Sequence, residues 1–123
     1  MRVKVGLPPQ ATHDLLGMEG EQSLGHASCI LTRMREHPTI ADRARWLSHL
    51  FVEPEHRRAG EAKRLMRQIV AQADAQGILI VLEPKVEDDS TGLTIEALQA
   101  FYRSFGFARV QDQPPIWARA PRH

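Results

Sequence analysis

The sequence is poor in cysteine and in net charge. Cys29 is the single cysteine of the 123 residues, so an internal disulfide is excluded and a reducing compartment is favoured. The formal net charge is +1, so no global field draws the chain to nucleic acid or to a membrane surface. No run approaches the roughly 20 apolar residues of a membrane helix, and the run before Pro8 is too short for a secretory signal. We therefore expect a soluble, cytoplasmic protein.

Several catalytic signatures are also missing from the sequence. It contains neither the Gly-Lys-Ser/Thr ending of a P-loop nor the three-glycine dinucleotide fingerprint, so nucleotide hydrolysis and hydride transfer lose their main support. His-Glu-x-x-His and Cys-x-x-Cys spacings are absent too, and we expect no metal site. Cys29 is interpreted as a small buried hydrophobe, because no histidine can be paired with it.

The remaining composition is that of an ordinary folded domain. With 42% hydrophobic and 25% charged residues, the chain is expected to form a single domain over 1–123. The residues 33–44, which include Pro38, are expected to be a loop, and the stretch 13–23 is ambiguous. The acidic run 87–89 is interpreted as a solvated loop. Strands are predicted at 2–5, 25–32, 45–52, 78–82, 107–110 and 116–120.

Two helices have clear periodic patterns. The first begins after Gly60, and Gly77 is placed to end it in the left-handed conformation. Its polar face includes Asp74. The second helix is expected over 95–105, with Thr94 as N-cap and Gly106 as the stop. The apolar positions of the first helix recur at helical spacing: Ala62, Leu65, Met66, Ile69, Val70 and Ala73. Together with the strands before and after it, this helix predicts a right-handed crossover unit.

The stretch "EHRRAGEAKRLM", 55–66, has the features of an anion-binding helix start. The first turn of a helix leaves backbone N–H groups unpaired and carries partial positive charge. Gly60 and Ala62 allow a bulky phosphate to approach the backbone, and Arg57 and Arg58 add charge-assisted donors. The stretch is therefore expected to bind a pyrophosphate group.

This stretch resembles the acetyl-CoA signature of the GCN5-related N-acetyltransferase (GNAT) family, Arg/Gln-x-x-Gly-x-Gly/Ala, which here is the segment 57–62. The family's lead-in strand, Leu-x-Val-x-Pro, matches 50–54. The segment "LQAFYRSFGF", 98–107, is similar to the family's second element, Phe/Leu-Tyr-x-x-x-Gly-Phe. The resemblance implies an α/β fold: a mixed, mostly antiparallel sheet with a central strand-helix-strand acetyl-CoA-binding unit. Because few residues precede 25–32, it also implies a reduced N-terminal helical region.

The resemblance assigns roles to numbered positions. Tyr102 matches the tyrosine that protonates the departing CoA thiolate. The backbone of three strand residues would pair with the pantetheine arm where two strands separate. Those residues are Leu50, Phe51 and Val52. The backbone around the helix start would hold the pyrophosphate, over Arg57, Arg58, Ala59, Gly60, Glu61, Ala62 and Lys63.

The residue that deprotonates the acceptor amine is left open. His49, Glu53 and Glu83 lie in or just after the two central strands and are the candidates. Strand alternation places His49, Phe51 and Glu53 on the face opposite Leu50 and Val52. The asparagine that commonly precedes the tyrosine helix in the family is missing here, as are its usual N-terminal helices, so the acceptor pocket is expected to be open or completed by a partner chain.

We therefore expect an N-acetyltransferase that moves acetyl from acetyl-CoA directly to a primary amine. The alternative is a catalytically silent acyl-CoA-binding or interaction module of the same fold. A third possibility, nucleic-acid binding through a basic cluster on the helix, is disfavoured because no aromatic residues are interleaved with it. The acceptor is not identified, and a homodimer that completes the cleft is a possible assembly.

Overall fold

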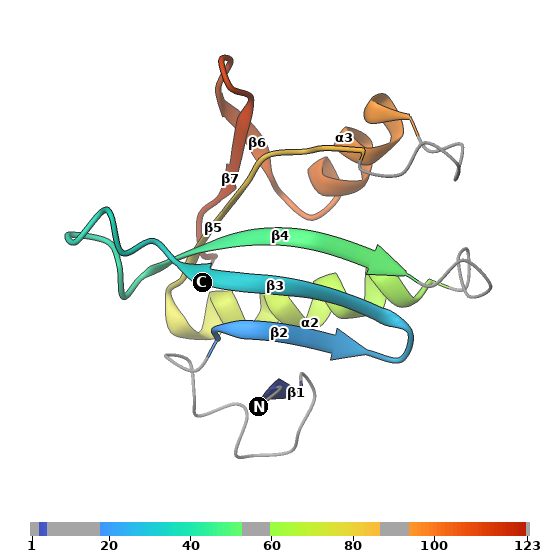
Figure 1. Ribbon diagram of the computed structural model, residues 1–123, viewed down its shortest axis with the longest axis horizontal. Helices are drawn as coiled ribbons and strands as arrows, with labels where there is room; N and C mark the ends of the chain where they lie inside the picture. Colours follow the sequence, from blue (N-terminus) through green and yellow to red (C-terminus); the bar gives the residue numbers. More distant parts are fainter. Residues whose placement is uncertain (1–2, 5–17, 53–59, 87–93, 123) are drawn as a thin grey trace.

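One mixed sheet forms the frame of the molecule. The computed structural model describes residues 3–4, 18–52, 60–86 and 94–122 (Figure 1). Among these residues, seven strands pair in the order β1-β2-β3-β4-β5-β7-β6. The β1/β2 and β4/β5 pairs are parallel and the other four pairs are antiparallel, which confirms the predicted mixed, mostly antiparallel sheet. The strands are β1 (Val3–Lys4), β2 (Gly20–Leu24), β3 (Ala27–Arg33), β4 (Ala44–Val52), β5 (Leu79–Leu82), β6 (Ala108–Gln111) and β7 (Ile116–Arg119).

The first antiparallel hairpin corrects one predicted boundary. The strand expected over 25–32 begins at Ala27, because Gly25 and His26 form the turn between β2 and β3. Gly25 has φ +60°, as the first central residue of a tight hairpin turn of type II′ requires. The ambiguous stretch before this turn supplies β2, and the segment between β3 and β4 forms turns, as expected for a loop.

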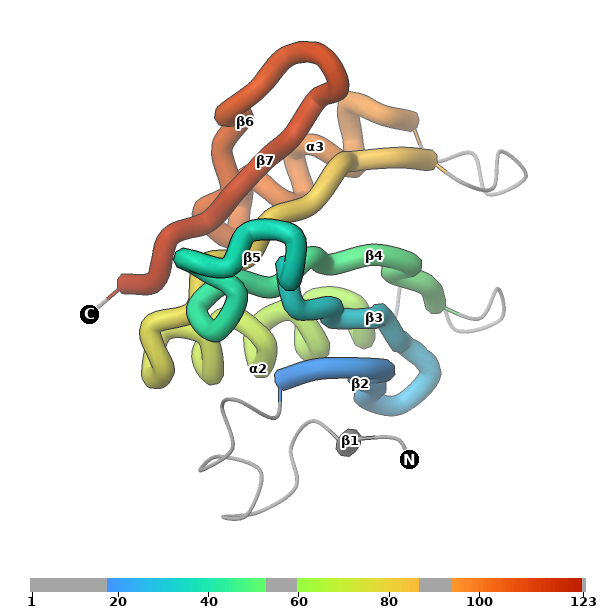
Figure 2. Tube along the Cα trace, turned by 60° about the vertical axis from the view of Figure 1, so that its left-hand side comes forward, coloured from blue at the N-terminus to red at the C-terminus, as the bar shows by residue number. Residues whose placement is uncertain are grey.

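Helix α2 (Glu61–Gln76) covers one face of β2, β3 and β4 (Figures 1 and 2). Four of the predicted apolar positions, Leu65, Met66, Ile69 and Ala73, are fully buried. Burying a side chain of leucine or isoleucine size contributes about 1.5–3 kcal/mol. Gly77 has φ +71° and caps the helix as predicted. The parallel β4/β5 pair on either side of α2 confirms the crossover unit.

Helix α3 (Ile95–Arg103) begins where the sequence predicts and ends earlier. The hydroxyl of Thr94 accepts the N–H of Ala97 at 3.1 Å, which is an N-cap. The helix ends at Arg103 because the next N–H groups, of Phe105 and Gly106, bond three residues back in a tighter turn. Gly106, with φ +94°, then starts the connection to β6.

Two arginines of the sheet, Arg45 and Arg119, are buried, and no local sequence pattern predicts this. Arg45, within the apolar run of β4, is fully buried, and its guanidinium donates to the carbonyls of Met18 and Ala44. Asp74, expected on the polar face of α2, instead forms a bidentate ion pair with Arg119 of β7, with N–O distances of 2.6 and 3.1 Å. Arg119 also donates from Nε to the carbonyl of Phe105 at 2.6 Å. One network therefore joins α2, β7 and the end of α3.

Two predictions concern regions that the structure describes only in part. The reduced N-terminal helical region was predicted for the residues between the first strand and β2, of which 5–17 lie outside the described residues. Within the part of the chain that the structure describes, no helix is long and apolar enough to cross a membrane.

Candidate active site

The central feature of the site is the separation of β4 from β5. Their parallel pairing runs from Ala44↔Leu79 to Trp46↔Val81 and ends there. β4 continues to Val52 beside β3 alone, while β5 pairs with β7 up to Leu82. Figure 1 shows the two strands diverging towards their C-terminal ends. The sequence contributes through Pro84, which has no N–H for a sheet and follows closely after β5.

A β-bulge lies in β4 just beyond the point of separation. Ser28 pairs with Phe51 and Ile30 with Ser48, so Cys29 faces two residues, His49 and Leu50. His49 has φ +57°, which is uncommon for a residue with a side chain. An extra residue of this kind bends its strand. The bulge therefore bends β4 just after the point at which its pairing with β5 ends.

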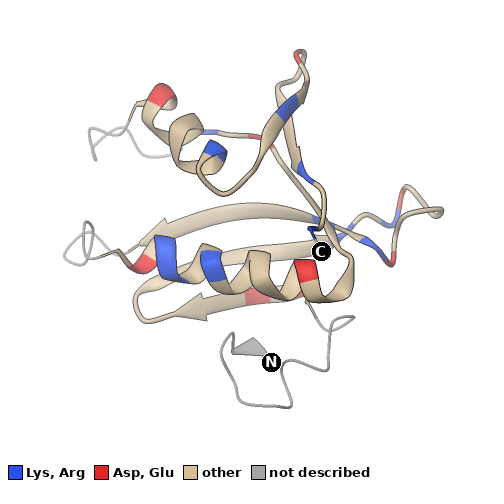
Figure 3. Cartoon of the chain, turned by 180° about the vertical axis from the view of Figure 1, so that it is seen from behind, with Lys and Arg blue, Asp and Glu red and all other residues tan. Residues whose placement is uncertain are grey.

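The start of α2 lies at the same end of the sheet as the end of β4 (Figure 1). Its N-cap is Gly60, with φ +80°, which offers no side-chain acceptor to the first N–H groups of the helix. Among the described residues, a Cβ on Gly60 would meet only the Arg64 side chain, at 3.5 Å. Figure 3 shows basic residues along the first half of α2, on the side away from the sheet, and Lys63 and Arg64 there are exposed. These features suit an anion.

The structure describes only part of the predicted binding segment. Leu50 and Val52 pack against the core, whereas Phe51 is 45% exposed on the opposite face, as alternation predicted. Gly60, Glu61, Ala62 and Lys63 occupy the helix start. Glu61 is unusual among them, because its side chain lies against the β2/β3 turn. Arg57, Arg58 and Ala59 lie outside the described residues.

Tyr102 lies on the inner side of α3. It is 5% exposed, and its ring makes edge contacts with Phe101 and Phe107, with ring centroids 5.6 Å apart in both pairs. These contacts fix the ring, and its helix lies across the separation from β4 in Figure 1. The predicted apolar stripe of α3 is thus real, and a buried position is compatible with both a structural and a proton-donating role.

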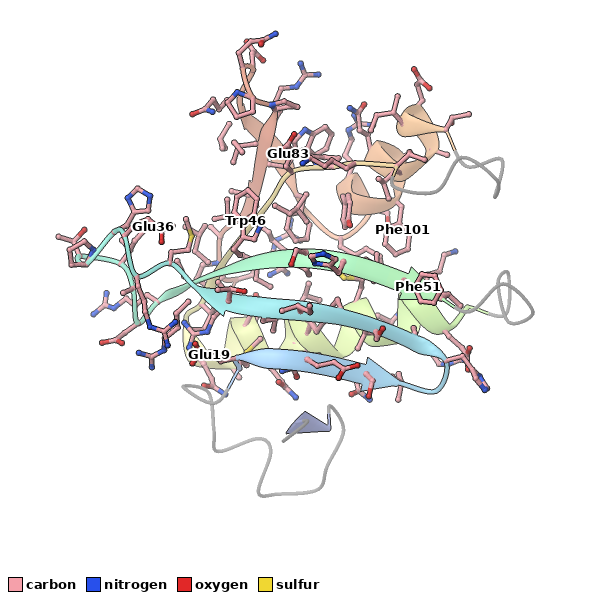
Figure 4. All side chains as sticks on the ribbon, viewed as in Figure 1. Glu19, Glu36, Trp46, Phe51, Glu83 and Phe101 are labelled. Carbon is pink, nitrogen blue, oxygen red and sulfur yellow. The ribbon has the colours of Figure 1, made fainter. Side chains whose placement is uncertain are left out.

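The two base candidates that the structure describes lie on the two sides of the separation. His49 is exposed in the bulge, with Nδ1 3.0 Å from the hydroxyl of Ser48. Glu83 follows β5 and lies 3.8 Å from the Lys85 ammonium (Figure 4). Glu53 lies outside the described residues. His49 and Glu83, the two candidates that the structure describes, contact different neighbours, and the choice among the three stays open.

Cysteine and metal chemistry find no support in the described part of the chain. Cys29 is 1% exposed, and burial raises the pKa of its thiol to about 12, so the reactive thiolate is scarce. No group of three or more His, Cys, Asp or Glu residues able to hold a metal ion occurs among the described residues.

The family is established by comparison with known proteins. The model of the acetyltransferase (GNAT) domain matches residues 15–109, which is most of the chain. The chain therefore belongs to the GNAT acetyltransferase family, as its sequence motifs indicated. This assignment supports acyl transfer as its general chemistry.

Individual relatives share a segment of the chain. Human N-acetyltransferase 8 is 36% identical over 85 residues and human N-acetyltransferase 8B is 33% identical over 85 residues. In both cases the match covers 68% of this chain and 35% of the relative, so the chain spans about a third of the length of these curated relatives.

Solved structures share the fold at low identity. A GNAT-family acetyltransferase from Staphylococcus aureus Mu50 has a TM-score of 0.54 at 19% identity, over 79% of this chain and 60% of that chain. The ribosomal-protein-S18-alanine N-acetyltransferase from Escherichia coli has a TM-score of 0.55 at 16% identity, over 80% and 63% of the two chains. Ard1 from Thermoplasma volcanium has a TM-score of 0.54 at 15% identity, over 79% and 64%.

Proposed function

We propose that the protein transfers acetyl from acetyl-CoA to a primary amine without a covalent enzyme intermediate. The observation that carries the proposal is the separation of β4 from β5 beside the start of α2. A strand that runs on without its parallel neighbour suits an amide-containing ligand that adds as a strand. The pantetheine arm has two amides, and its pyrophosphate would reach the helix start.

The residues fit this substrate in two ways. Beyond Trp46, β4 runs from Leu47 to Val52 without β5 beside it, which gives room for the pantetheine arm. Gly60 presents no side chain to a phosphate at the helix start, and the one contact that a Cβ there would make with the described residues is with the flexible side chain of Arg64. Arg57 and Arg58, from the sequence motif, would supply further cations.

The chemical step needs two proton movements. The neutral amine attacks the thioester carbon, the carbon–sulfur bond breaks, and the thiolate leaves with one proton. We assign that proton to the Tyr102 hydroxyl, because a phenol close to the sulfur stabilises the developing charge. His49, Glu53 or Glu83, directly or through water, would take the proton that the amine loses.

The binding test uses two glycines of the same helix. Gly60 and Gly77 both have positive φ and lie at opposite ends of α2, so a side chain strains the backbone similarly at both. Gly60→Trp places a bulky group at the phosphate site, whereas Gly77→Trp places it in open space at the far end. Calorimetric titration with acetyl-CoA is expected to show binding by wild type and Gly77→Trp and none by Gly60→Trp.

Turnover is tested separately by release of CoA thiol across a panel of primary amines. Turnover with any amine supports the transferase. Binding without turnover across the panel favours the silent acyl-CoA-binding module. Failure of wild type to bind acetyl-CoA would contradict both functions. The homodimer expected from the sequence stays a prediction, and light scattering tests it.

A further inference from the structure

Glu61 stands at a place where the proposed function makes a carboxylate unfavourable. It is the first residue of α2, and an acid there normally stabilises a helix by interacting with its positive end. The same end is proposed to hold a pyrophosphate, and a carboxylate close to it repels that anion. The direction of the Glu61 side chain therefore decides whether it opposes or supports binding.

The side chain lies against the turn between β2 and β3. Its exposure is 12%, and Oε2 is 3.3 Å from Nδ1 of His26 in that turn. Arg64, one helical turn later, has Nη2 at 3.9 Å from the same oxygen. Gly25 permits this approach, because a Cβ there would collide with Oε2 of Glu61. The carboxylate thus joins two elements 35 residues apart in the sequence.

We propose that Glu61 is a positioning residue, which through His26 and Gly25 anchors the first turn of α2 to the β2/β3 turn and so sets the direction of the pyrophosphate-binding N–H groups. The inference rests on the proposed function. Gly60 has no side chain with which to brace the helix start, and the fully buried anchors of α2 begin at Leu65. Among the described residues, the Glu61 contact therefore braces the first turn of α2, next to the proposed anion site.

The charges around Glu61 are consistent with this role. The guanidinium of Arg64 faces the carboxylate and offsets part of its negative charge, and the ring of His26 lies within hydrogen-bond distance of it. The side chain points to the edge of the sheet at which β2 turns into β3, and Figure 1 shows this turn beside the start of α2. The N-terminal turn of α2 thus gains a fixed orientation, and its attraction for an anion is reduced only slightly.

The test separates geometry from charge with two substitutions at one position. Glu61→Gln keeps the shape and can hydrogen-bond His26 in either tautomer, but it removes the charge. Glu61→Ala removes both. If Glu61 positions the helix, Glu61→Ala raises the Kd for acetyl-CoA roughly five- to tenfold, because the ligand must then order the helix start. Glu61→Gln stays within about twofold of wild type or binds more tightly.

The matched control is Glu96→Ala. Glu96 occupies the first turn of the other helix, α3, and is exposed, so its removal changes the net charge equally without touching the anchor. Its Kd for acetyl-CoA is expected to equal that of wild type. His26→Ala removes the other partner of the same contact, so it is also expected to raise the Kd for acetyl-CoA, as Glu61→Ala does.

Calorimetry also separates positioning from simple stabilisation. Loss of a contact that only stabilises the fold lowers the melting temperature, and it changes the measured Kd only where a substantial fraction of the protein is unfolded. A raised Kd at a temperature well below the melting temperature of Glu61→Ala, where the variant is folded, supports positioning. Equal Kd values for Glu61→Ala and wild type, or tighter binding by Glu61→Ala as well as Glu61→Gln, would overturn it while leaving the proposed function intact. If wild type itself does not bind acetyl-CoA, both fail.

Discussion

Deletion of His49 is expected to stabilise the protein and to abolish acetyl-CoA binding. His49 is the extra residue of the β4 bulge, and without it Ser48, Leu50 and Phe51 would pair in regular register with Ile30, Cys29 and Ser28. The deletion keeps Leu50 and Val52 facing the core, because the bulge adds one outward residue beyond regular alternation.

The magnitude follows from the conformation of His49. Its φ of +57° costs about 1 kcal/mol, and regular pairing in place of the bulge adds about another 0.5–1 kcal/mol. The free energy of unfolding should therefore rise by about 1.5–2 kcal/mol in urea titrations followed by circular dichroism. Calorimetry of the same variant should show no binding of acetyl-CoA, because removing the bulge changes the path of the β4 backbone that is proposed to pair with the pantetheine arm.

His49→Gly is the matched control. It keeps the number of residues, and therefore the bulge, while glycine adopts the positive φ without steric cost. This variant should bind acetyl-CoA as wild type does, with a stability within about 1 kcal/mol of it. A deletion variant that binds acetyl-CoA with the wild-type Kd would show that the bulge does not form the site. An unfolded deletion variant would refute the register argument.

Three further outcomes are expected. Asp74→Asn should lower the free energy of unfolding by about 2 kcal/mol at pH 7, because it leaves the buried Arg119 without its counter-charge. The hydrogen bond from Arg119 lowers the pKa of Asp74, so this stability is present above the unfolded pKa of about 3.9 and is lost as pH falls through the lower folded value. In urea unfolding, the stabilities of wild type and Asp74→Asn should converge in acid, and a difference in stability that is independent of pH would refute this linkage. Asp42→Asn is the control: it should change the free energy of unfolding by less than about 0.5 kcal/mol, because the Asp42 side chain in its ion pair with Arg33 is 75% exposed. Tyr102→Phe should lower kcat by about 10²–10⁴ with the Kd for acetyl-CoA unchanged, and an unaltered kcat would remove Tyr102 from proton transfer. Cys29 should react with iodoacetamide at pH 8 at least about 100-fold more slowly in the folded than in the urea-unfolded protein, as followed by mass spectrometry, since its pKa is raised to about 12; equal rates would contradict its burial.

The elements that the sequence predicts well are those whose signal is local. Helix α2 has a helical repeat of apolar residues and a glycine at its end, and Thr94 before α3 is a strong N-cap. The strand-helix-strand unit follows from these patterns and from the lengths of the segments. The acetyl-CoA signature around Gly60 can be found in the same way, because it is defined by residues that are neighbours in the sequence.

What the sequence does not reveal depends on residues far apart in the chain. The bulge at His49 exists only relative to Cys29 of the neighbouring strand, and no local pattern marks it. Arginine is rarely buried, and Arg45 can be buried because the backbone carbonyl of Met18, in a separate segment, accepts a hydrogen bond from its guanidinium. Glu61 fits the motif by position, yet its contact with His26 becomes visible only when the hairpin folds back to α2.

The separation of β4 and β5 requires a firm connection at its closed end. Beyond Trp46 the two strands no longer pair, so the end of β4 is not joined through the sheet to β5, which leads to α3 and Tyr102. The position of α3 relative to β4 is therefore transmitted through β5, through β7 and through the ion pair of Asp74 with Arg119. Figures 1 and 2 show the end of α2 and the end of the chain together at the side where β4 and β5 are still paired. Because Arg119 also holds the carbonyl of Phe105, the same side chain fixes the segment that leaves α3. The pair of Asp74 and Arg119 therefore holds α3 in place relative to β4 from a position remote from the separation.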